Sequence, residues 1–244
     1  MDRIEPRTAT KTPACPPAHA ALLRLDEVSK TYLSNGQSVD ALHGVSLEVH
    51  EGEFLAIVGR SGCGKSTLLN LAGAMDFPTS GRILLEGQST SELSDYGLTL
   101  LRRKKVGFIF QSFQLLNTLS VLENVELPLL LAGESETRTR AQRQLELVEI
   151  GDLAARMPHQ LSGGQMQRVA IARAMVHEPR LLLADEPTGN LDTQTGNLIL
   201  ALLRRIADEQ RTAILMATHS AESAAFADAI VKLRDGRIAE VTGR

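Results

Sequence analysis

Residues 59–66 are the part of the sequence whose residue types and spacing point most directly to chemistry. They read GRSGCGKS and match the pattern G-x-x-x-x-G-K-[ST] at every fixed position. The glycines let the backbone curl so that successive N–H groups face inward, and a helix starting here adds about half a positive charge at its N-terminus. Such a loop binds phosphate. We expect Lys65 to reach the β- and γ-phosphates of a nucleotide and the Ser66 hydroxyl to ligate Mg²⁺.

The segments on either side of this loop favour nucleotide binding over the alternative, a plain glycine turn. Residues 54–58 are a continuous apolar run, as expected for a strand covered on both faces, and the residues from Lys65 onward have a helical pattern. A chance match occurs in about one per cent of unrelated chains of this length. A loop between a buried strand and a helix is what phosphate binding requires. The predicted nucleotide contacts in this segment are Gly59, Arg60, Ser61, Gly62, Cys63, Gly64, Lys65, Ser66 and Thr67.

Two adjacent acids, Asp185 and Glu186, end the apolar run of residues 181–184. An open parallel sheet binds its ligand at the carboxyl ends of its strands, so both side chains are expected beside the phosphates. Asp185 is placed to hold Mg²⁺ through a coordinated water, and Glu186 to accept a proton from the attacking water. The alternative is a pair of solvated acids that begin a turn before Pro187, and the phosphate loop argues against it.

Length and composition limit the other classes of function. The 244 residues, of which 43% are hydrophobic and 23% charged, suit one large α/β domain. The formal net charge of −3 offers no general attraction to nucleic acid or anionic lipid, and an aromatic content of 3% argues against base-stacking surfaces. We therefore expect no nucleic-acid partner. No apolar run of about 18 residues is present, so a role at a membrane has to come through a protein partner.

The N-terminal segment, residues 1–20, is expected to form a disordered tail. Pro13, Pro16 and Pro17, and the lack of an apolar core segment, also argue against a signal peptide. Cys15 in this tail and Cys63 in the phosphate loop have no metal-ligand spacing, and a disulfide framework is not expected, which fits a reducing cytosol. Cys63 occupies a variable position of the loop, so its thiol is expected to have no chemical role.

Strand patterns alternate with helical ones along most of the chain, which predicts a mainly parallel sheet covered by helices. Leu198, Leu202 and Ile206 recur every four residues and mark one apolar face of a helix. Asp235-Gly236 is expected to turn a hairpin between residues 230–233 and 237–240. Strands are predicted at residues 23–32, 45–49, 54–58, 83–85, 106–110, 181–184 and 213–216. Helices are predicted at residues 121–131 and 138–148, with breaks at Gly133 and Gly151.

A second glycine-containing segment, residues 161–165, reads LSGGQ. A serine and two glycines stand before a predicted helix at residues 167–176, in which Ile171, Ala174 and Met175 face inward, so the segment is a second helix terminus suited to phosphate. A chance match to all five residues is expected in well under about one in a thousand chains. The segment resembles the signature of ABC ATPases.

This resemblance covers the chain from Leu22 to Glu240 and implies its architecture. It implies a P-loop NTPase core of the RecA type with a mainly parallel sheet, an N-terminal antiparallel β portion and an inserted α-helical subdomain at about residues 112–165 of an ABC ATPase domain at 21–244. In this family two domains pair head to tail, and each signature closes on the ATP of the other subunit. The implied cofactors are ATP and Mg²⁺, and the implied nucleotide contacts of the signature are Ser162, Gly163, Gly164 and Gln165.

The resemblance also gives roles to four residues outside these motifs. Tyr32 resembles the aromatic that stacks on adenine, and Gln111 the glutamine near Mg²⁺ and the membrane-domain contact. Asp192 resembles the acid that crosses the dimer interface, and His219 the histidine that contacts the γ-phosphate. Taken alone, Tyr32 is also explained as a surface aromatic, Gln111 as a strand end, Asp192 as a helix N-cap and His219 as a structural histidine.

Residues 106–111 (VGFIFQ), 115–129 (LLNTLSVLENVELPL) and 187–192 (PTGNLD) indicate the subgroup. They resemble the ATPases of the lipoprotein-releasing and macrolide-efflux (LolD/MacB-like) group. This implies a homodimer that binds integral membrane permeases at the cytoplasmic face of the inner or plasma membrane and serves export, extraction or mechanical signalling. An amino-acid-type importer ATPase and a non-transport ABC ATPase that regulates a membrane complex are the alternatives. Ser220 and Met166 depart from the residues common in the family.

Overall fold

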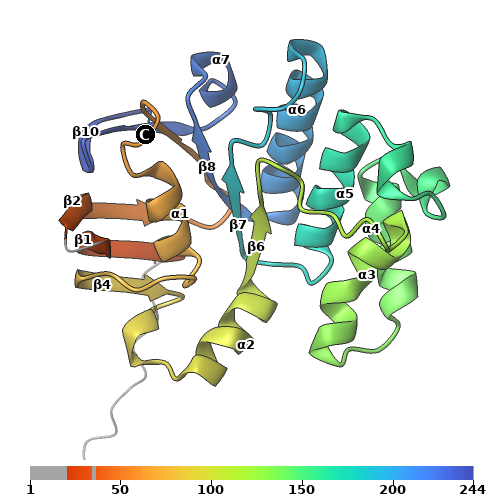
Figure 1. Cartoon of the computed structure of the whole chain (residues 1–244), viewed down its shortest axis with the longest axis horizontal. Coiled ribbons are helices and arrows are strands. Elements are labelled where there is room, and N and C mark those ends of the chain that lie inside the picture. Colours follow the sequence, from red (N-terminus) through yellow and green to blue (C-terminus); the bar gives the residue numbers. More distant parts are fainter. Residues whose placement is uncertain (1–20, 35–36, 244) are drawn as a thin grey trace, which may run out of the picture.

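Two β-sheets organise the described part of the chain, residues 21–34 and 37–243 of the computed structural model (Figure 1). The larger sheet has the strand order β10-β9-β3-β8-β7-β6, and only the β10–β9 pair within it is antiparallel. Its strands are β3 (Phe54–Val58), β6 (Val106–Ile109), β7 (Leu181–Asp185), β8 (Ala213–Thr218), β9 (Ala229–Arg234) and β10 (Arg237–Thr242). The predicted mainly parallel sheet is confirmed. The predicted tail, residues 1–20 with Cys15, lies outside the described residues.

Side chains of the central strands alternate between two hydrophobic cores. Phe54 and Ala56 of β3 belong to one core, while Leu55 and Ile57 belong to the other. The strands β7 and β8 divide their residues in the same way. Successive side chains of a strand point to opposite faces, so a strand covered on both faces needs an unbroken apolar run. This is why the sequence at 54–58 lacks alternation.

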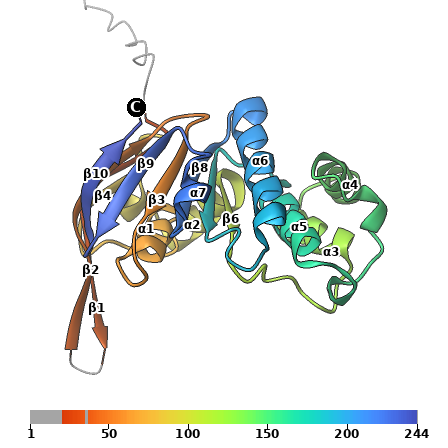
Figure 2. The same cartoon turned by 90° about the horizontal axis from the view of Figure 1, so that it is seen from above.

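The second sheet is antiparallel and has the strand order β2-β1-β4-β5. It confirms the expected N-terminal antiparallel portion. The helix α1 (Lys65–Ala72) lies between the two sheets and shares one core with both. Figure 2 shows β1 and β2 extending beyond the rest of this sheet. The strands are β1 (Leu23–Ser34), β2 (Gln37–Val49), β4 (Ser80–Leu85) and β5 (Gln88–Ser89).

The opposite face of the larger sheet is covered by α5 (Gly163–Met175) and α6 (Thr193–Gln210), and α3 (Val121–Ala132) and α4 (Thr137–Leu147) lie beyond α5 (Figure 1). Ser120 and Glu123 form a capping box at the start of α3, and Gly133 ends the helix with a left-handed φ of 71°. Of these helices, α3 and α4 fall in the expected segment 112–165. They share one core with the sheet, so the subdomain boundary stays a prediction.

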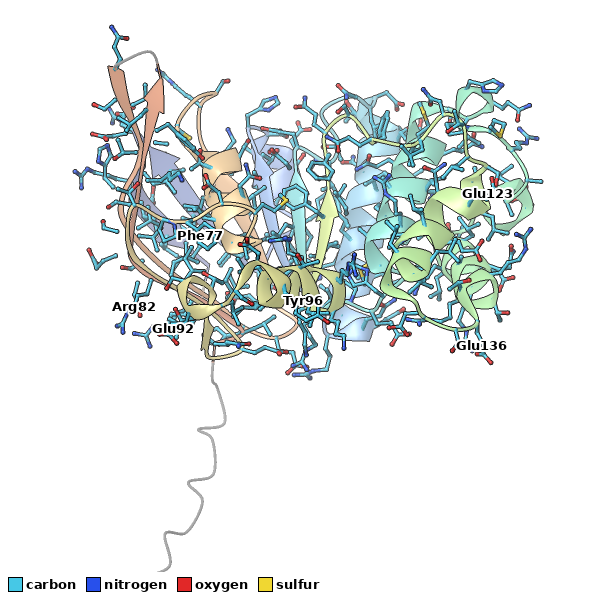
Figure 3. All side chains as sticks on the ribbon, turned by 60° about the horizontal axis from the view of Figure 1, so that its bottom comes forward. Phe77, Arg82, Glu92, Tyr96, Glu123 and Glu136 are labelled. Carbon is cyan, nitrogen blue, oxygen red and sulfur yellow. The ribbon has the colours of Figure 1, made fainter. Side chains whose placement is uncertain are left out.

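Three expectations for individual elements were wrong or incomplete. Leu198 is 55% exposed, and Ile199 and Leu203 are buried in its place, because the face of α6 follows a period of 3.6 rather than 4 residues. The helix α5 starts at Gly163 rather than at residue 167. The helix α2 (Asp95–Lys105) had no predicted counterpart, since it buries only Leu98 and leaves Tyr96 exposed on its outer side (Figure 3).

The hairpin predicted around Asp235-Gly236 is present between β9 and β10, and both turn residues have positive φ, 47° and 73°. This is the backbone that an Asp-Gly pair favours in a tight hairpin. The remaining short elements are α7 (Ala221–Ala224) and the 3₁₀ turns η1 (Thr90–Glu92), η2 (Gly151–Leu153) and η3 (Pro158–Gln160). None of the helices in the described residues has the length and apolar content needed to cross a membrane.

Candidate nucleotide-binding site

The predicted catalytic and metal-binding residues meet at one edge of the larger sheet. The strands β3, β8, β7 and β6 are consecutive neighbours and all parallel, so their carboxyl ends lie together. Each end delivers one predicted group: the phosphate loop, His219, the pair Asp185 and Glu186, and Gln111. A cleft of about 620 Å³ lies there, a volume that suits a ligand of nucleotide size. It is lined by Val39, Asp40, Ala41, Ser61, Gly62, Gly64, Lys65, Ser66, Thr67, Gln111, Asp185, Glu186 and His219.

The phosphate loop requires glycine at Gly64. This residue has a left-handed φ of 104°, and a Cβ added to it would lie 2.5 Å from the Ala41 carbonyl oxygen. Gly64 is also the N-cap of α1, and no capping hydrogen bond from a side chain is made at this position. The first backbone N–H groups of a helix have no partner within the helix. Those of α1 are therefore available to an anion in the cleft.

Lys65 holds its ammonium group at the mouth of this loop. The side chain is buried, and Nζ donates hydrogen bonds to the carbonyl oxygens of Gly59 at 2.9 Å and Arg60 at 3.2 Å. Glu186 Oε1 lies 3.9 Å from the same nitrogen. These carbonyls keep the positive charge beside the loop, and a phosphate that enters would be a stronger partner for it than neutral oxygens.

Asp185 and Glu186 have different surroundings although they are adjacent. Burial raises the pKa of the Asp185 carboxyl, and a hydrogen bond from Ser66 opposes this shift. Glu186 has a left-handed φ of 48°, unusual for a residue other than glycine. Its Oε2 lies 2.9 Å from His219 Nδ1. Other non-glycine residues outside the cleft, such as Glu178, have the same backbone conformation, so the predicted role of Glu186 rests on its contacts with Lys65 and His219.

The signature residues do not line the cleft. Ser162 is the N-cap of α5, where its Oγ accepts a hydrogen bond from the Gln165 N–H at 3.3 Å while Gln165 Oε1 accepts one from the Ser162 N–H at 2.9 Å. Asp192 is likewise the N-cap of α6 and accepts a hydrogen bond from the Thr195 N–H at 3.0 Å. Hydrogen bonds from the Thr195 side chain and from its backbone hold the pKa of the Asp192 carboxyl below the ordinary value. The alternative role of Asp192 as a cap is thus present, and its role at an interface stays a prediction.

Comparison with known proteins decides the family. Residues 42–189, more than half of the chain, match the family model described as ABC transporter. This chain belongs to the ABC transporter family. It is an ATP-binding ATPase of that family, as its fold and motifs predicted.

Individual relatives of this ABC ATPase agree with that assignment. It is 48% identical to an uncharacterized ABC transporter ATP-binding protein of Thermotoga maritima, over 91% of this chain and 96% of the relative. It is 44% identical to the lipoprotein-releasing system ATP-binding protein LolD of Shewanella denitrificans, over 92% and 97%. A macrolide export ATP-binding/permease protein MacB of Brucella melitensis is 46% identical over 91% of this chain, which spans 34% of that protein.

Solved structures give the same fold. The dimeric structure of the cassette MJ0796, whose sequence comes from Methanocaldococcus jannaschii, superposes with a TM-score of 0.84 and 42% identity over 91% of this chain and 98% of that one. A post-hydrolysis dimer of the same cassette bound to ADP and Pi superposes with a TM-score of 0.83. The fold class predicted for the ABC ATPase is therefore confirmed.

Tyr32 of the ABC ATPase lies at the protruding end of β1, outside the cleft lining. Its hydroxyl donates a hydrogen bond to Asp76 Oδ2 at 2.8 Å, and Lys30 Nζ lies 4.8 Å from the ring centroid. The ring is 38% exposed. These contacts fix its orientation and leave part of the ring accessible, so adenine stacking stays a prediction.

Sequence reasoning missed three residues of the cleft, Val39, Asp40 and Ala41. They belong to β2, which begins at Gln37 rather than at residue 45 as predicted. The signal for them was weak, because the outer half of β2 is exposed on both faces and shows no alternation. Cys63 is buried behind the loop, and its Sγ would lie 2.5 Å from a Cβ added at Gly59, so it packs against the loop backbone.

The residues predicted to hold Mg²⁺ fit that ion. Ser66, Asp185 and Gln111 line one cleft and offer a hydroxyl, a carboxylate and an amide oxygen, which are the ligand types that Mg²⁺ prefers together with phosphate oxygens. Burial raises the pKa of the Asp185 carboxyl, and a bound cation would stabilise its charged form. No cluster of three or more His, Cys, Asp or Glu residues in the described ranges provides a metal site of its own.

Proposed function

We propose that two copies of this chain pair head to tail around two ATP molecules and drive integral membrane permeases of the lipoprotein-releasing and macrolide-efflux kind. The pair would act at the cytoplasmic face of the inner or plasma membrane. One observation carries the proposal: the chain has two helix termini suited to phosphate, and only that of α1 opens into the cleft of its own chain. The signature at α5 needs a ligand from outside, and a second copy supplies one.

Each residue of the cleft has a distinct task in this proposal. Lys65 and the loop N–H groups bind the triphosphate, and Ser66, Asp185 and Gln111 hold Mg²⁺, which neutralises charge on the phosphates. Glu186 accepts the proton of the attacking water. His219, 2.9 Å from Glu186, orients that carboxylate and is placed to contact the γ-phosphate. Ser162 and the N–H groups of Gly163 and Gly164 close on the nucleotide of the partner.

The proton-acceptor role of Glu186 is tested by Glu186→Gln. The amide keeps the shape but cannot take a proton, so we expect ATP turnover to fall about 10²–10⁴-fold. ATP should then hold the pair together long enough for gel filtration to resolve a dimer. Glu178→Gln is the matched control, because Glu178 is an exposed glutamate that also has a left-handed φ, of 55°, and lies outside the cleft. Normal turnover in Glu186→Gln would refute the assignment.

The choice of permease is tested by co-purification in detergent. We expect the chain to retain a membrane protein with a large extracytoplasmic domain, as the resemblance to the LolD and MacB proteins suggests. Recovery of a small amino-acid-type importer permease instead would favour the first alternative. Recovery with DNA or ribosomes would favour a non-transport ATPase.

A further inference from the structure

Arg173 is a cation that the predicted mechanism does not use. It lies in the last turn of α5 and is largely buried, and burial lowers the pKa of its guanidinium. No acidic side chain in the described part of the chain opposes this shift. A buried charge without an opposite charge is costly unless strong hydrogen bonds satisfy it. The partners of Arg173 therefore carry information about its role.

Those partners are two successive carbonyl oxygens of the segment that follows Gln111. Arg173 donates to the Gln114 oxygen through Nη1 at 2.6 Å and to the Phe113 oxygen through Nη2 at 2.8 Å. The planar guanidinium suits such a paired contact, and lysine cannot reproduce its geometry. The two carbonyls lie 59 and 60 positions from Arg173 in sequence, so the contact joins distant parts of the chain.

The segment held in this way has a backbone that is unfavourable by itself. Phe113 has a φ of 58° and Gln114 a φ of 49°, two successive left-handed residues that are not glycine. Such residues persist only where the surroundings impose the conformation. The preceding Gln111 is held from the other side, because Asn190 Nδ2 donates to its carbonyl oxygen at 2.8 Å. The conformation after β6 thus depends on hydrogen bonds from α5 and from the segment after β7.

The helix that carries Arg173 also carries the signature at its other end. Ser162 caps α5, and Arg173 lies eleven positions after it, which corresponds to about 16 Å along the axis of a helix. The helix α5 is continuous and packs against α3, α4 and α6 (Figure 1), so we expect it to move as one rigid element. Displacement of the Ser162 end is therefore transmitted to the carbonyls of Phe113 and Gln114.

We propose that Arg173 is a positioning residue that couples the signature of each chain to Gln111 in the cleft of the same chain. This inference rests on the proposed pairing. When the signature closes on the nucleotide of the partner, α5 shifts, and Arg173 moves the segment after Gln111. Gln111 then reaches its working position only when both sites of the pair are closed. The two sites hydrolyse ATP cooperatively for this reason.

The test compares Arg173→Lys with Arg168→Lys in the full chain. Arg168 is also on α5 and donates to a backbone oxygen, that of Val148 at 2.7 Å, but it has no contact with the segment 111–114. We expect Arg173→Lys to lower kcat about tenfold, to leave the KM for ATP within about twofold, and to bring the Hill coefficient close to one. Arg168→Lys should keep all three parameters near those of the unchanged protein.

A second substitution separates positioning from mere stabilisation of the fold. Glycine adopts positive φ without strain, so Gln114→Gly favours the segment's conformation without Arg173. Added to Arg173→Lys, it should recover several-fold of the lost kcat, while a purely structural defect would not respond. Normal kcat and cooperativity in Arg173→Lys, or no recovery in the double variant, would overturn the inference. An unchanged protein that fails to pair in ATP would contradict the proposed function instead.

Discussion

The N-termini of α1 and α5 are both suited to phosphate, but they differ in whether side chains already cap their backbone N–H groups. At α1 the cap is Gly64, which has no side chain, and the first turn opens into the cleft. At α5 the side chains of Ser162 and Gln165 satisfy N–H groups at the helix start in a capping box. Capping satisfies donors that a helix start otherwise leaves free.

The difference indicates which of the two termini is ready to bind. The terminus of α1 is prepared within a single chain, at the cost of left-handed glycines and a buried lysine. The terminus of α5 is already capped by its own side chains, and in the proposed pair its serine hydroxyl would be shared with the nucleotide of the partner. An open site in each chain, together with a signature that binds only a nucleotide held by another chain, would make pairing depend on ATP.

The largest effect expected at these two helix termini is that of Gly64→Ala, which adds a side chain at the N-cap of α1. A left-handed alanine costs about 1–2 kcal/mol, and its Cβ, 2.5 Å from the Ala41 oxygen, adds about 1–3 kcal/mol of overlap. We expect ATP affinity, measured by titration with a fluorescent analogue, to fall by roughly 100-fold or more. Gly62→Ala is the control. Gly62 is also left-handed but has no atom within 4 Å of an added Cβ, so its loss should be about tenfold. Equal losses would show that the overlap is unimportant.

Much of the site at the N-terminus of α1 could be predicted from the sequence, because its chemistry is local. A loop of fixed spacing after an apolar run determines both the backbone and the ligand, and Asp185 and Glu186 follow from their place at a strand end. His219 was predicted from the resemblance to ABC ATPases. The edge formed by residues 39–41 could not be predicted, because it depends on how β2 pairs with β1 far from any apolar pattern. The capping box at α5 follows the spacing S-x-x-Q, but only the structure shows that it is formed.

The contacts of Arg173 mark the limit of prediction from sequence. Positive φ at Phe113 and Gln114 has no sequence signal, since neither residue is glycine or asparagine. The hydrogen bonds that impose it come from α5, about 60 positions away. Interactions of this kind depend on the packing of the whole domain. Leu198 shows the same limit on a smaller scale. The predicted period of four residues placed Leu198 on the buried face of α6, whereas the structure buries the next residue, Ile199, instead.

A smaller effect is expected at the capped terminus, where Ser162→Ala and Ser162→Asp separate two roles. Alanine removes the cap, which should lower stability by about 1 kcal/mol and the thermal midpoint by about 2–4 °C. Aspartate is as good a cap as serine, so it should keep the midpoint, but its charge repels a phosphate. We expect both variants to lose ATPase activity, by about tenfold or more, while only alanine lowers the midpoint in thermal unfolding. Full activity in Ser162→Asp would show that this terminus does not meet a nucleotide.

The smallest expected effect concerns Asp185, whose charged carboxylate lowers the stability of the folded protein when the cleft is empty. Burial raises the pKa of this carboxyl in the folded protein, so the folded state holds the proton more tightly than the unfolded state does. This proton binding contributes to the free energy of unfolding at low pH, and the contribution is lost as pH rises from the ordinary aspartate pKa through the raised one.

Asp185→Asn removes the charge. Without nucleotide and Mg²⁺, the variant should melt about 1–2 °C higher at pH 7, a small gain because the group is only partly buried, and the gain should vanish near pH 3. Asp235→Asn, at a site whose side chain is 89% exposed and outside the cleft, is the control substitution. An Asp185→Asn variant that is less stable at pH 7 would show that the carboxylate is well compensated in the empty cleft, and that α1 and its surroundings are prepared for ATP without a cost in stability.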